Sequence, residues 1–121
     1  GVSSAASDVY KRQDEVHRPA PLKKKEQKMR EKQIEQKLVQ AVRKSGGMCL
    51  KFVSPNFVGM PDRLILLPGG KIAFAELKAP GKKPRPLQLA RHKALMKLGF
   101  RVYIIDRVEQ IGAILDEIQS T

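Results

Sequence analysis

The sequence has one cysteine, no tryptophan and few aromatic residues, namely four phenylalanines and two tyrosines among 121 residues. A single cysteine forms neither an internal disulfide nor a cysteine-cluster zinc site, and Cys49 lies among apolar neighbours, so we expect a reduced thiol in the core. The sequence also lacks a Walker-type phosphate loop, an internal repeat, a secretory apolar segment and a membrane-spanning run. We therefore expect no nucleotide cofactor, no membrane contact and, by default, a cytoplasmic protein.

Positive charge is abundant, with 24 Lys and Arg against 12 Asp and Glu, a net charge of +12. Such a surplus favours polyanions, chiefly the phosphate backbone of nucleic acids. A basic run interrupted by prolines and glycine predicts an extended loop along a phosphate strand, and its cations are Lys78, Lys82, Lys83 and Arg85. Since aromatic side chains are too few for extensive base stacking, we expect recognition of duplex or branched DNA through its backbone.

The N-terminal segment, residues 1–28, is rich in Ser, Ala, Pro and Lys and has little apolar periodicity, so we expect it to be disordered. Residues 8–13 (DVYKRQ) resemble a translated transposon adapter. We therefore expect residues 1–28 to be a non-native leader and Met29 to be the true start of the protein. Residues 29–121 would then form one domain, encoded by a phage or prophage. The leader holds seven basic and four acidic residues, which leaves 17 against 8 and a net charge of +9 for the domain.

The domain sequence alternates helical and strand patterns, which predicts an α/β fold. The predicted helices are 30–44, 86–98 and 108–118, and the predicted strands are 48–53, 62–67, 71–78 and 101–105. A Gly-Gly pair is expected to cap the first helix, and a Pro-Gly-Gly turn to close a hairpin between the second and third strands. The order αβββαβα and a parallel crossover through the second helix predict a mixed four-stranded sheet flanked by helices.

Two carboxylates and a lysine are expected to meet at one edge of this sheet. Asp62 opens one arm of the hairpin and Glu76 closes the other, so the hairpin places them side by side. Lys78 lies two residues after Glu76 and therefore on the same face. The alternative is a surface hairpin with ordinary solvated charges. Glu76 and Lys78, however, continue the apolar face of Ile72 and Phe74, where burying an unpaired polar group costs free energy. Mg²⁺ or Mn²⁺ would relieve the repulsion between the acids.

A third carboxylate is expected from the first predicted helix. Glu35 falls within its apolar arc, near Leu38 and Val42, where an unpaired acid is rare, so we assign it to the site. Glu31 lies one turn earlier, and we interpret it as a first-turn charge that interacts favourably with the helix dipole.

The order of a helical Glu, Pro-Asp and Glu-x-Lys resembles the PD-(D/E)XK nuclease superfamily, and the fuller pattern resembles its VRR-NUC branch. The matching segments are EKQIEQKLVQAVRKSGG, LKFVSPNFVGMPDRLILLPGGKIAFAELKAPGKKPRPLQ and ALMKLGFRVYIID, within residues 29–114. Two short motifs alone would be weak evidence, but the flanking glycines, Lys51 and Gln88 also match. The resemblance implies the restriction-endonuclease-like core for this domain.

The resemblance implies a role for each matching residue. Asp62 and Glu76 hold a metal together with the Leu77 main-chain carbonyl, and Lys78 is the catalytic lysine. Glu35 is a metal- or water-linked acid, and Gln88 is an active-site residue. From their charge and position in the sequence, we also expect several basic side chains to contact DNA, namely Lys51, Lys82, Lys83, Arg85, Arg91 and His92. For Arg91, solvent is the alternative, and for His92 the alternatives are the site itself, a surface position or packing.

We therefore predict a Mg²⁺- or Mn²⁺-dependent DNA endonuclease that leaves a 5′-phosphate. The resemblance further implies a homodimer and a branched substrate such as a Holliday junction. The alternatives are a nicking or flap nuclease, or a non-catalytic basic DNA-binding module that keeps the fold.

Overall fold

The computed structural model describes residues 20–120, which form one sheet covered by helices on both faces. The elements in chain order are α2 (Lys24–Lys44), β1 (Met48–Lys51), β2 (Arg63–Leu67), β3 (Lys71–Leu77), α3 (Pro86–Lys97), β4 (Arg101–Ile105), the 3-10 turn η1 (Val108–Gln110) and α4 (Ile111–Gln119). The strands lie in the order β1-β2-β3-β4, with two antiparallel pairings followed by a parallel one. The predicted mixed four-stranded α/β sheet is confirmed.

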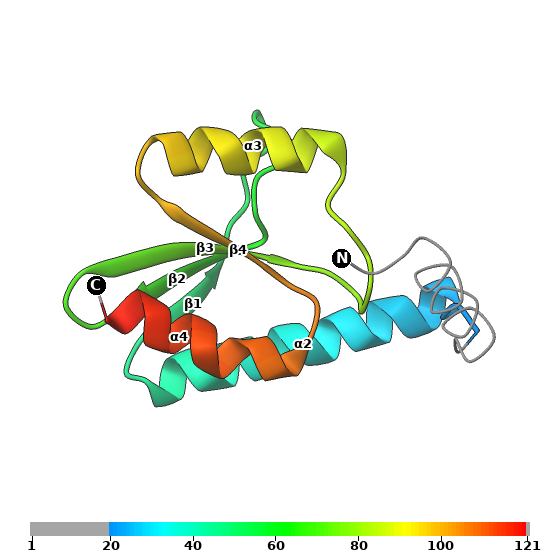
Figure 1. The fold of residues 1–121 in the computed structure, drawn as a ribbon, viewed down its shortest axis with the longest axis horizontal. Helices are drawn as coiled ribbons and strands as arrows, with labels where there is room; N and C mark the ends of the chain where they lie inside the picture. Colours follow the sequence, from blue (N-terminus) through cyan, green and yellow to red (C-terminus); the bar gives the residue numbers. More distant parts are fainter. Residues whose placement is uncertain (1–19, 121) are drawn as a thin grey trace, which may run out of the picture.

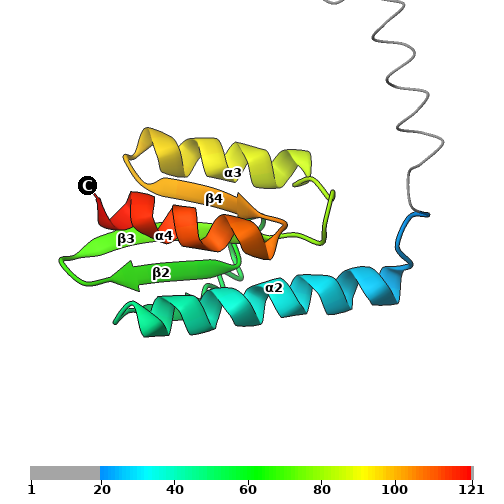
Figure 2. The same ribbon diagram turned by 60° about the horizontal axis from the view of Figure 1, so that its bottom comes forward.

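The two faces of the sheet are covered by different helices. Figure 1 shows α3 on one face and α2 with α4 on the other, and Figure 2 shows α2 running beneath the strands. None of the helices within residues 20–120 combines the length and the apolar character that crossing a membrane requires.

Helix α2 begins at Lys24, six residues earlier than predicted. The expectation of disorder throughout the leader is therefore wrong for its last five residues, 24–28, whereas residues 1–19 lie outside the described part of the chain. The physical reason is local: Lys, Glu, Gln and Met are good helix formers, so a helix forms here without an apolar stripe. Pro21 precedes this start, and the Gln27 side chain donates to the Leu22 carbonyl at 3.0 Å. Whether Met29 is the true start stays a prediction.

The Gly-Gly pair ends α2 as predicted. Gly46 has φ +83°, its N–H donates to the Arg43 carbonyl, and the Gly47 N–H donates to the Val42 carbonyl. These two bonds form a Schellman motif, in which a glycine in the left-handed region satisfies the last carbonyls of the helix. The turn directs the chain straight into β1.

The core lies between the sheet and the α2–α4 layer. Ala73, Ala75 and Leu77 project from β3 into this layer and are at most 2% exposed. The opposite face is thinner: Phe74 packs edge-to-face against Phe52 and Phe100, with ring centroids 5.6 and 5.9 Å apart. Cys49 is buried and free, as predicted. Since residues alternate between faces, Glu76 shares the α3 face with Phe74.

The β2–β3 hairpin sets the position of the acids. Arg63 pairs with Ala75 in the antiparallel register, so the residue before Arg63 lies opposite Glu76. Gly69 and Gly70 close the turn with φ of +85° and +73°, a conformation that favours glycine. A shift of one residue would turn the buried face outward, so the alternating pattern keeps this register.

We predict that Gly47→Ala strongly destabilises the fold. A Cβ there would lie 2.1 Å from the Leu66 carbonyl oxygen and 2.9 Å from Leu67 Cδ2, so the backbone must shift. We expect a loss of roughly 1–3 kcal/mol in the free energy of unfolding, measured by urea denaturation. Gly112→Ala is the control, because nothing lies within 4 Å of its added Cβ in α4. The control should gain about 0.5–1 kcal/mol, and equal effects of the two variants would contradict the prediction.

Candidate active site

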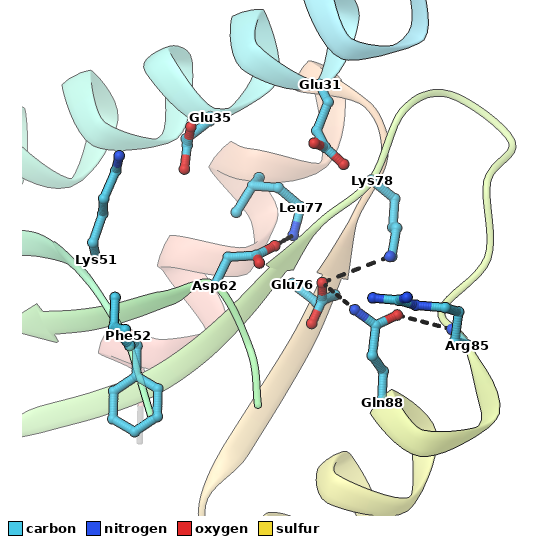
Figure 3. Close-up of a pocket in the computed structure, with 11 residues that line it drawn as sticks. Glu31, Glu35, Lys51, Phe52, Asp62, Glu76, Leu77, Lys78, Arg85 and Gln88 are labelled. Carbon is cyan, nitrogen blue, oxygen red and sulfur yellow. Dashed lines mark hydrogen bonds and ion pairs between the residues drawn. The ribbon is translucent and has the colours of Figure 1, made fainter. Parts of the chain in front are cut away.

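A pocket of about 400 Å³ opens where β2 begins and β3 ends, between α2 and the start of α3. Its lining comprises Glu31, Glu35, Lys51, Phe52, Val53, Asp62, Glu76, Leu77, Lys78, Arg85 and Gln88. Figure 3 shows the polar side chains converging from both helix layers on the end of β3. The structure therefore brings the predicted acid, lysine and glutamine side chains into one pocket.

Asp62 is held at two points. Its main-chain carbonyl accepts from the Phe52 N–H at 2.8 Å, and its Oδ2 accepts from the Leu77 N–H at 2.9 Å. These bonds join the loop before β2 to β1 on one side and to β3 on the other. The carboxylate consequently lies beside Glu76, as the hairpin predicted.

Glu76 is a buried acid, with a side chain only 1% exposed. Burial, reinforced by the charge and the hydrogen bond of Asp62, raises the pKa of Glu76 from 4.5 to about 8, while Lys78 opposes the rise. Neighbouring carboxylates raise the pKa of one of the pair, because keeping both charged is costly. The pair is suited to a divalent cation, which would take the place of a proton.

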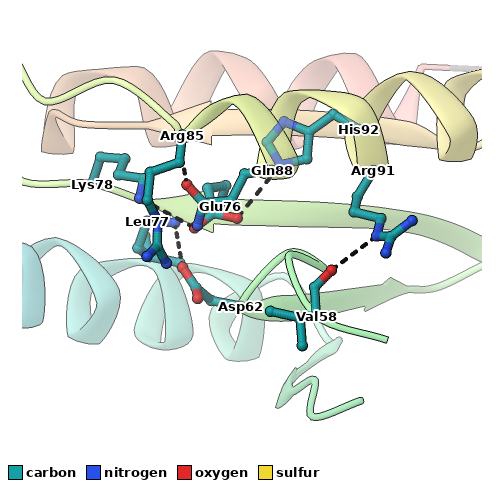
Figure 4. A network of polar contacts seen from close by, with 9 residues as sticks. All are labelled: Val58, Asp62, Glu76, Leu77, Lys78, Arg85, Gln88, Arg91 and His92. Atoms are coloured by element: carbon teal, nitrogen blue, oxygen red, sulfur yellow. Dashed lines mark hydrogen bonds and ion pairs between the residues drawn. The ribbon is translucent and has the colours of Figure 1, made fainter. Parts of the chain in front are cut away.

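Three further side chains surround the Glu76 carboxylate (Figure 4). Gln88 Nε2 donates to Oε2 at 3.1 Å, Lys78 Nζ lies 3.8 Å from the same oxygen, and His92 Nε2 lies 3.4 Å from Oε1. Gln88 Oε1 also accepts from the Arg85 N–H at 2.8 Å and so caps α3. Because both contacts of Gln88 require the same amide orientation, the cap of α3 and the orientation of Glu76 are coupled.

Glu31 and Glu35 of α2 both line the pocket, as predicted for Glu35, but they have different neighbours. Glu35 Oε2 is 3.0 Å from Arg63 Nε, and Arg63 also donates to the Cys49 carbonyl at 3.1 Å, so this acid ties α2 to the sheet. Glu31 points towards Lys78 in Figure 3. Burial, and next the charge of Asp62, raise the pKa of Glu31.

The first-turn interpretation of Glu31 is wrong, because α2 begins at Lys24 and the acid of its first turn is Glu26. The signal that sequence reasoning missed was the run of strong helix formers before Met29, which shifts the helix start and moves Glu31 beyond the first turn.

Arg91 and His92, which we expected to contact DNA, both have partners within the protein. Arg91 Nε donates to the Val58 carbonyl at 2.8 Å, and its guanidinium carbon lies 3.7 Å from the centre of the Phe57 ring. It thereby fastens the loop before Asp62 onto α3. His92 is 3% exposed and contacts Glu76, which matches the alternative that it reaches the site. Burial lowers the pKa of His92, so a neutral imidazole is favoured.

The remaining basic residues lie around the pocket. Lys51 and Arg85 line it, whereas Lys82 and Lys83 line an adjoining cavity. All four side chains are exposed. Their positions are compatible with the predicted phosphate contacts.

The donors in the pocket fit a hard cation that keeps water ligands. Within residues 20–120, no group of three or more Asp, Glu, His and Cys side chains is arranged to hold a metal. Asp62 and Glu76 supply a carboxylate pair, and Leu77 follows Glu76 in the chain and lines the same pocket. Mg²⁺ commonly binds through one or two carboxylates and retains several waters, which matches this donor set.

Comparisons with known proteins agree with the geometry. No family model matches the chain. A protein of Acyrthosiphon pisum secondary endosymbiont phage 1, named "Putative nuclease p44", is 55% identical over 78 residues, which cover 64% of this chain and 84% of the relative. A solved structure described as "VRR_NUC domain" superposes with a TM-score of 0.68 at 28% identity, over 72% of this chain and 95% of that chain. Sequence and structure together show that the chain belongs to the VRR-NUC family of the PD-(D/E)XK nuclease superfamily.

Proposed function

We propose that this chain is a divalent-metal-dependent DNA endonuclease. The observation that carries the proposal is the meeting of Asp62, Glu76 and Lys78 in one pocket of a strongly basic protein. The phage relative, which is named a nuclease, supports the same class of activity. Hydrolysis of a phosphodiester needs an activated water and stabilisation of charge on the phosphate, and these residues are suited to both tasks.

Each residue in the pocket has a proposed task. Asp62, Glu76 and the Leu77 carbonyl hold Mg²⁺ or Mn²⁺, which when bound polarises the scissile phosphate and lowers the pKa of water. Lys78 orients the attacking water and balances the charge that develops on the phosphate, since its amine lies beside Glu76. Gln88 holds the Glu76 carboxylate in position from α3.

We also propose Glu31 as the helix-borne acid of the site, in place of Glu35. Glu31 interacts with Asp62 and Lys78, whereas the Glu35 carboxylate is engaged by Arg63. Glu35 then has a positioning role, because its ion pair holds α2 against the sheet and so presents Glu31 to the pocket.

The proposed substrate is branched duplex DNA such as a Holliday junction, cut to leave a 5′-phosphate by a homodimer whose two sites act on two strands. Exposed apolar side chains on and just after α3, including Leu89, Met96 and Leu98, offer surface for self-association. We further propose that the protein acts in the cytoplasm of a bacterial host, a proposal that the similarity to a phage protein supports. A nicking or flap nuclease uses the same pocket chemistry.

The proposed function is tested by a Mg²⁺ and Mn²⁺ titration with linear, nicked, flapped and four-way DNAs. We expect metal-dependent cleavage, with the four-way DNA cut fastest. Metal-independent binding without cleavage of any substrate would favour a non-catalytic DNA-binding module. A preference for nicked or flapped DNA would support the nuclease activity but would contradict the four-way junction as its substrate.

We predict that Lys78→Ala lowers the cleavage rate by about 10²–10³-fold, because a charge placed to stabilise the transition state is lost. Binding of the same DNA should stay within a few-fold, since Lys78 is one of many cations. Single-turnover cleavage and a filter-binding assay measure the two effects. Lys71→Ala, at the opposite end of β3, is the matched control and should cleave normally. Full activity of Lys78→Ala would show that the lysine is misassigned.

We predict that Glu76 makes stability fall with pH in the absence of divalent cations. Its pKa is about 8 in the folded protein and 4.5 in the reference state, so between these values the native state binds the additional proton. Stability then falls as pH rises through this window, by up to about 1.4 kcal/mol per pH unit for one proton. Urea denaturation in EDTA from pH 5 to pH 8 should show this slope, and Mg²⁺ should flatten it by replacing the proton.

Glu76→Gln is the control for this pH dependence. It removes the titrating group and leaves Glu31 and His92 in place, so the difference between the two proteins isolates Glu76. The variant should lose that part of the slope. Parallel stability curves for the two proteins would contradict the assignment.

We predict that Glu31→Gln and Glu35→Gln separate catalysis from stability. Glu31→Gln should slow cleavage by at least about 10-fold while stability is kept, because a charge facing the reacting groups is lost. Glu35→Gln should cost about 0.5–1 kcal/mol of stability, because Arg63 loses its partner at a partly exposed position. Single-turnover rates and urea midpoints are measured for both variants. The reverse pattern would restore Glu35 as the acid of the site.

A further inference from the structure

A second cavity, of about 310 Å³, adjoins the active-site pocket. It lies between the start of α2 and the loop that leads from β3 to α3, and its lining comprises Lys24, Gln27, Lys28, Glu31, Lys78, Ala79, Lys82, Lys83 and Arg85. Three of these residues, Glu31, Lys78 and Arg85, also line the active-site pocket. The two cavities are therefore continuous. We refer to the second one as the basic cleft.

The basic cleft is strongly cationic. Six of its nine lining side chains are Lys or Arg, against one acid, Glu31. Within residues 20–120, Lys24, Lys28, Lys82, Lys83 and Arg85 have no acidic side chain within ion-pair distance. Like charges gathered in this way repel one another and attract an anion.

A third cavity, of about 520 Å³, lies on the other side of the active-site pocket and shares Glu35 and Lys51 with it. It also contains the cations Lys32, Arg43 and Arg63. All three cavities follow α2: the basic cleft contacts its first turns, the active-site pocket contacts Glu31 and Glu35, and the third cavity reaches Arg43. Acidic side chains thus occupy the middle of a path with cations on both sides.

We propose that one DNA strand runs along α2, with the scissile phosphate in the active-site pocket and a flanking backbone phosphate in the basic cleft, bound by Lys24 and Lys28 on one wall and Lys82 and Lys83 on the other. This inference rests on the proposed nuclease function and adds the path of the substrate strand. Lys24 and Lys28 come from the segment that the sequence suggested was a non-native leader, but both lie in helix α2 and line the cleft, so the inference requires that they belong to the native protein.

The dimensions of α2 agree with this path. The residues of α2 that line the basic cleft and those that line the third cavity are centred about ten positions apart, which is ~15 Å at 1.5 Å per residue. If the duplex axis lies parallel to α2, its rise of ~3.4 Å per base pair spans roughly four base-pair steps over this length. The active-site pocket lies midway, so about two steps separate the scissile phosphate from the phosphate in the basic cleft.

The first test measures the salt dependence of DNA binding by the full chain in Ca²⁺ with K24Q/K28Q. The control, K93Q/K97Q, removes the same charge at the same spacing from exposed positions of α3 that line neither the active-site pocket nor the basic cleft. Each lost phosphate contact lowers the slope of log affinity against log salt by about 0.9 on duplex DNA. We expect K24Q/K28Q to lower this slope by about 1–2 and the control to leave it unchanged. Equal slopes for the two variants would overturn the inference.

The second test locates the phosphate. Neutral methylphosphonates are placed singly at the three positions on each side of the scissile phosphate, and binding is measured with the unaltered protein and with K24Q/K28Q. A methylphosphonate at one position, on one side only, should weaken binding by the unaltered protein about tenfold. The same substitution should not weaken binding by K24Q/K28Q any further, because the neutral group and the missing lysines remove the same contact. Additive losses at every position would overturn the inference.

The outcomes separate this inference from the proposed function. If the unaltered protein cuts DNA but the two double variants bind alike, only the strand path is wrong. If the unaltered protein binds DNA without cutting it, the nuclease proposal fails. The salt dependence of binding by the two double variants then still shows whether the basic cleft binds a phosphate. A protein that binds no DNA would overturn both.

Discussion

The structure depends on keeping an ionisable carboxylate buried at the end of a central strand. Glu76 is 1% exposed, yet it lies next to Asp62, so its environment must supply compensating partners. Those partners come from α3, which contributes Gln88 and His92, and from the residue that follows β3, Lys78. The polar site therefore also fixes where α3 docks on a face that has little apolar packing of its own.

The two helix layers consequently have different tasks. The α2–α4 layer packs on Ala73, Ala75 and Leu77 of β3 and provides the apolar core. The α3 layer provides the polar partners of Glu76, namely Gln88 and His92, and Arg91 fastens the loop before Asp62 onto α3. The ion pair of Glu35 with Arg63 joins the first layer to the sheet next to the pocket, so that Glu31 from α2 reaches a site built mainly on the other face.

Local sequence signals predicted most of the fold and part of the site. The glycine caps, the hairpin turn and the strand alternation depend on neighbouring residues, so the register that brings Asp62 to Glu76 followed from the sequence. The proposed preference for Glu31 over Glu35 did not, because it depends on where α2 begins and on Arg63, which is distant in the sequence. For Arg91 and His92 the sequence offered a DNA contact together with other possibilities, namely solvent for Arg91 and the site, the surface or packing for His92. Their actual neighbours, Val58 and Glu76, are set by tertiary packing that no local pattern encodes.

The distribution of charge along α2 explains how a basic protein can place acids where a phosphate must bind. The carboxylates of Glu31, Asp62 and Glu76 would repel a DNA strand, whereas the cations on both sides of them attract it. In the proposed nuclease, the flanking cations hold the backbone even when the centre is unfavourable, and a divalent cation at the acids removes the remaining repulsion. Binding of metal and binding of the scissile phosphate are then mutually favourable, so each increases the affinity for the other. Cleavage is thereby confined to complexes in which both are present.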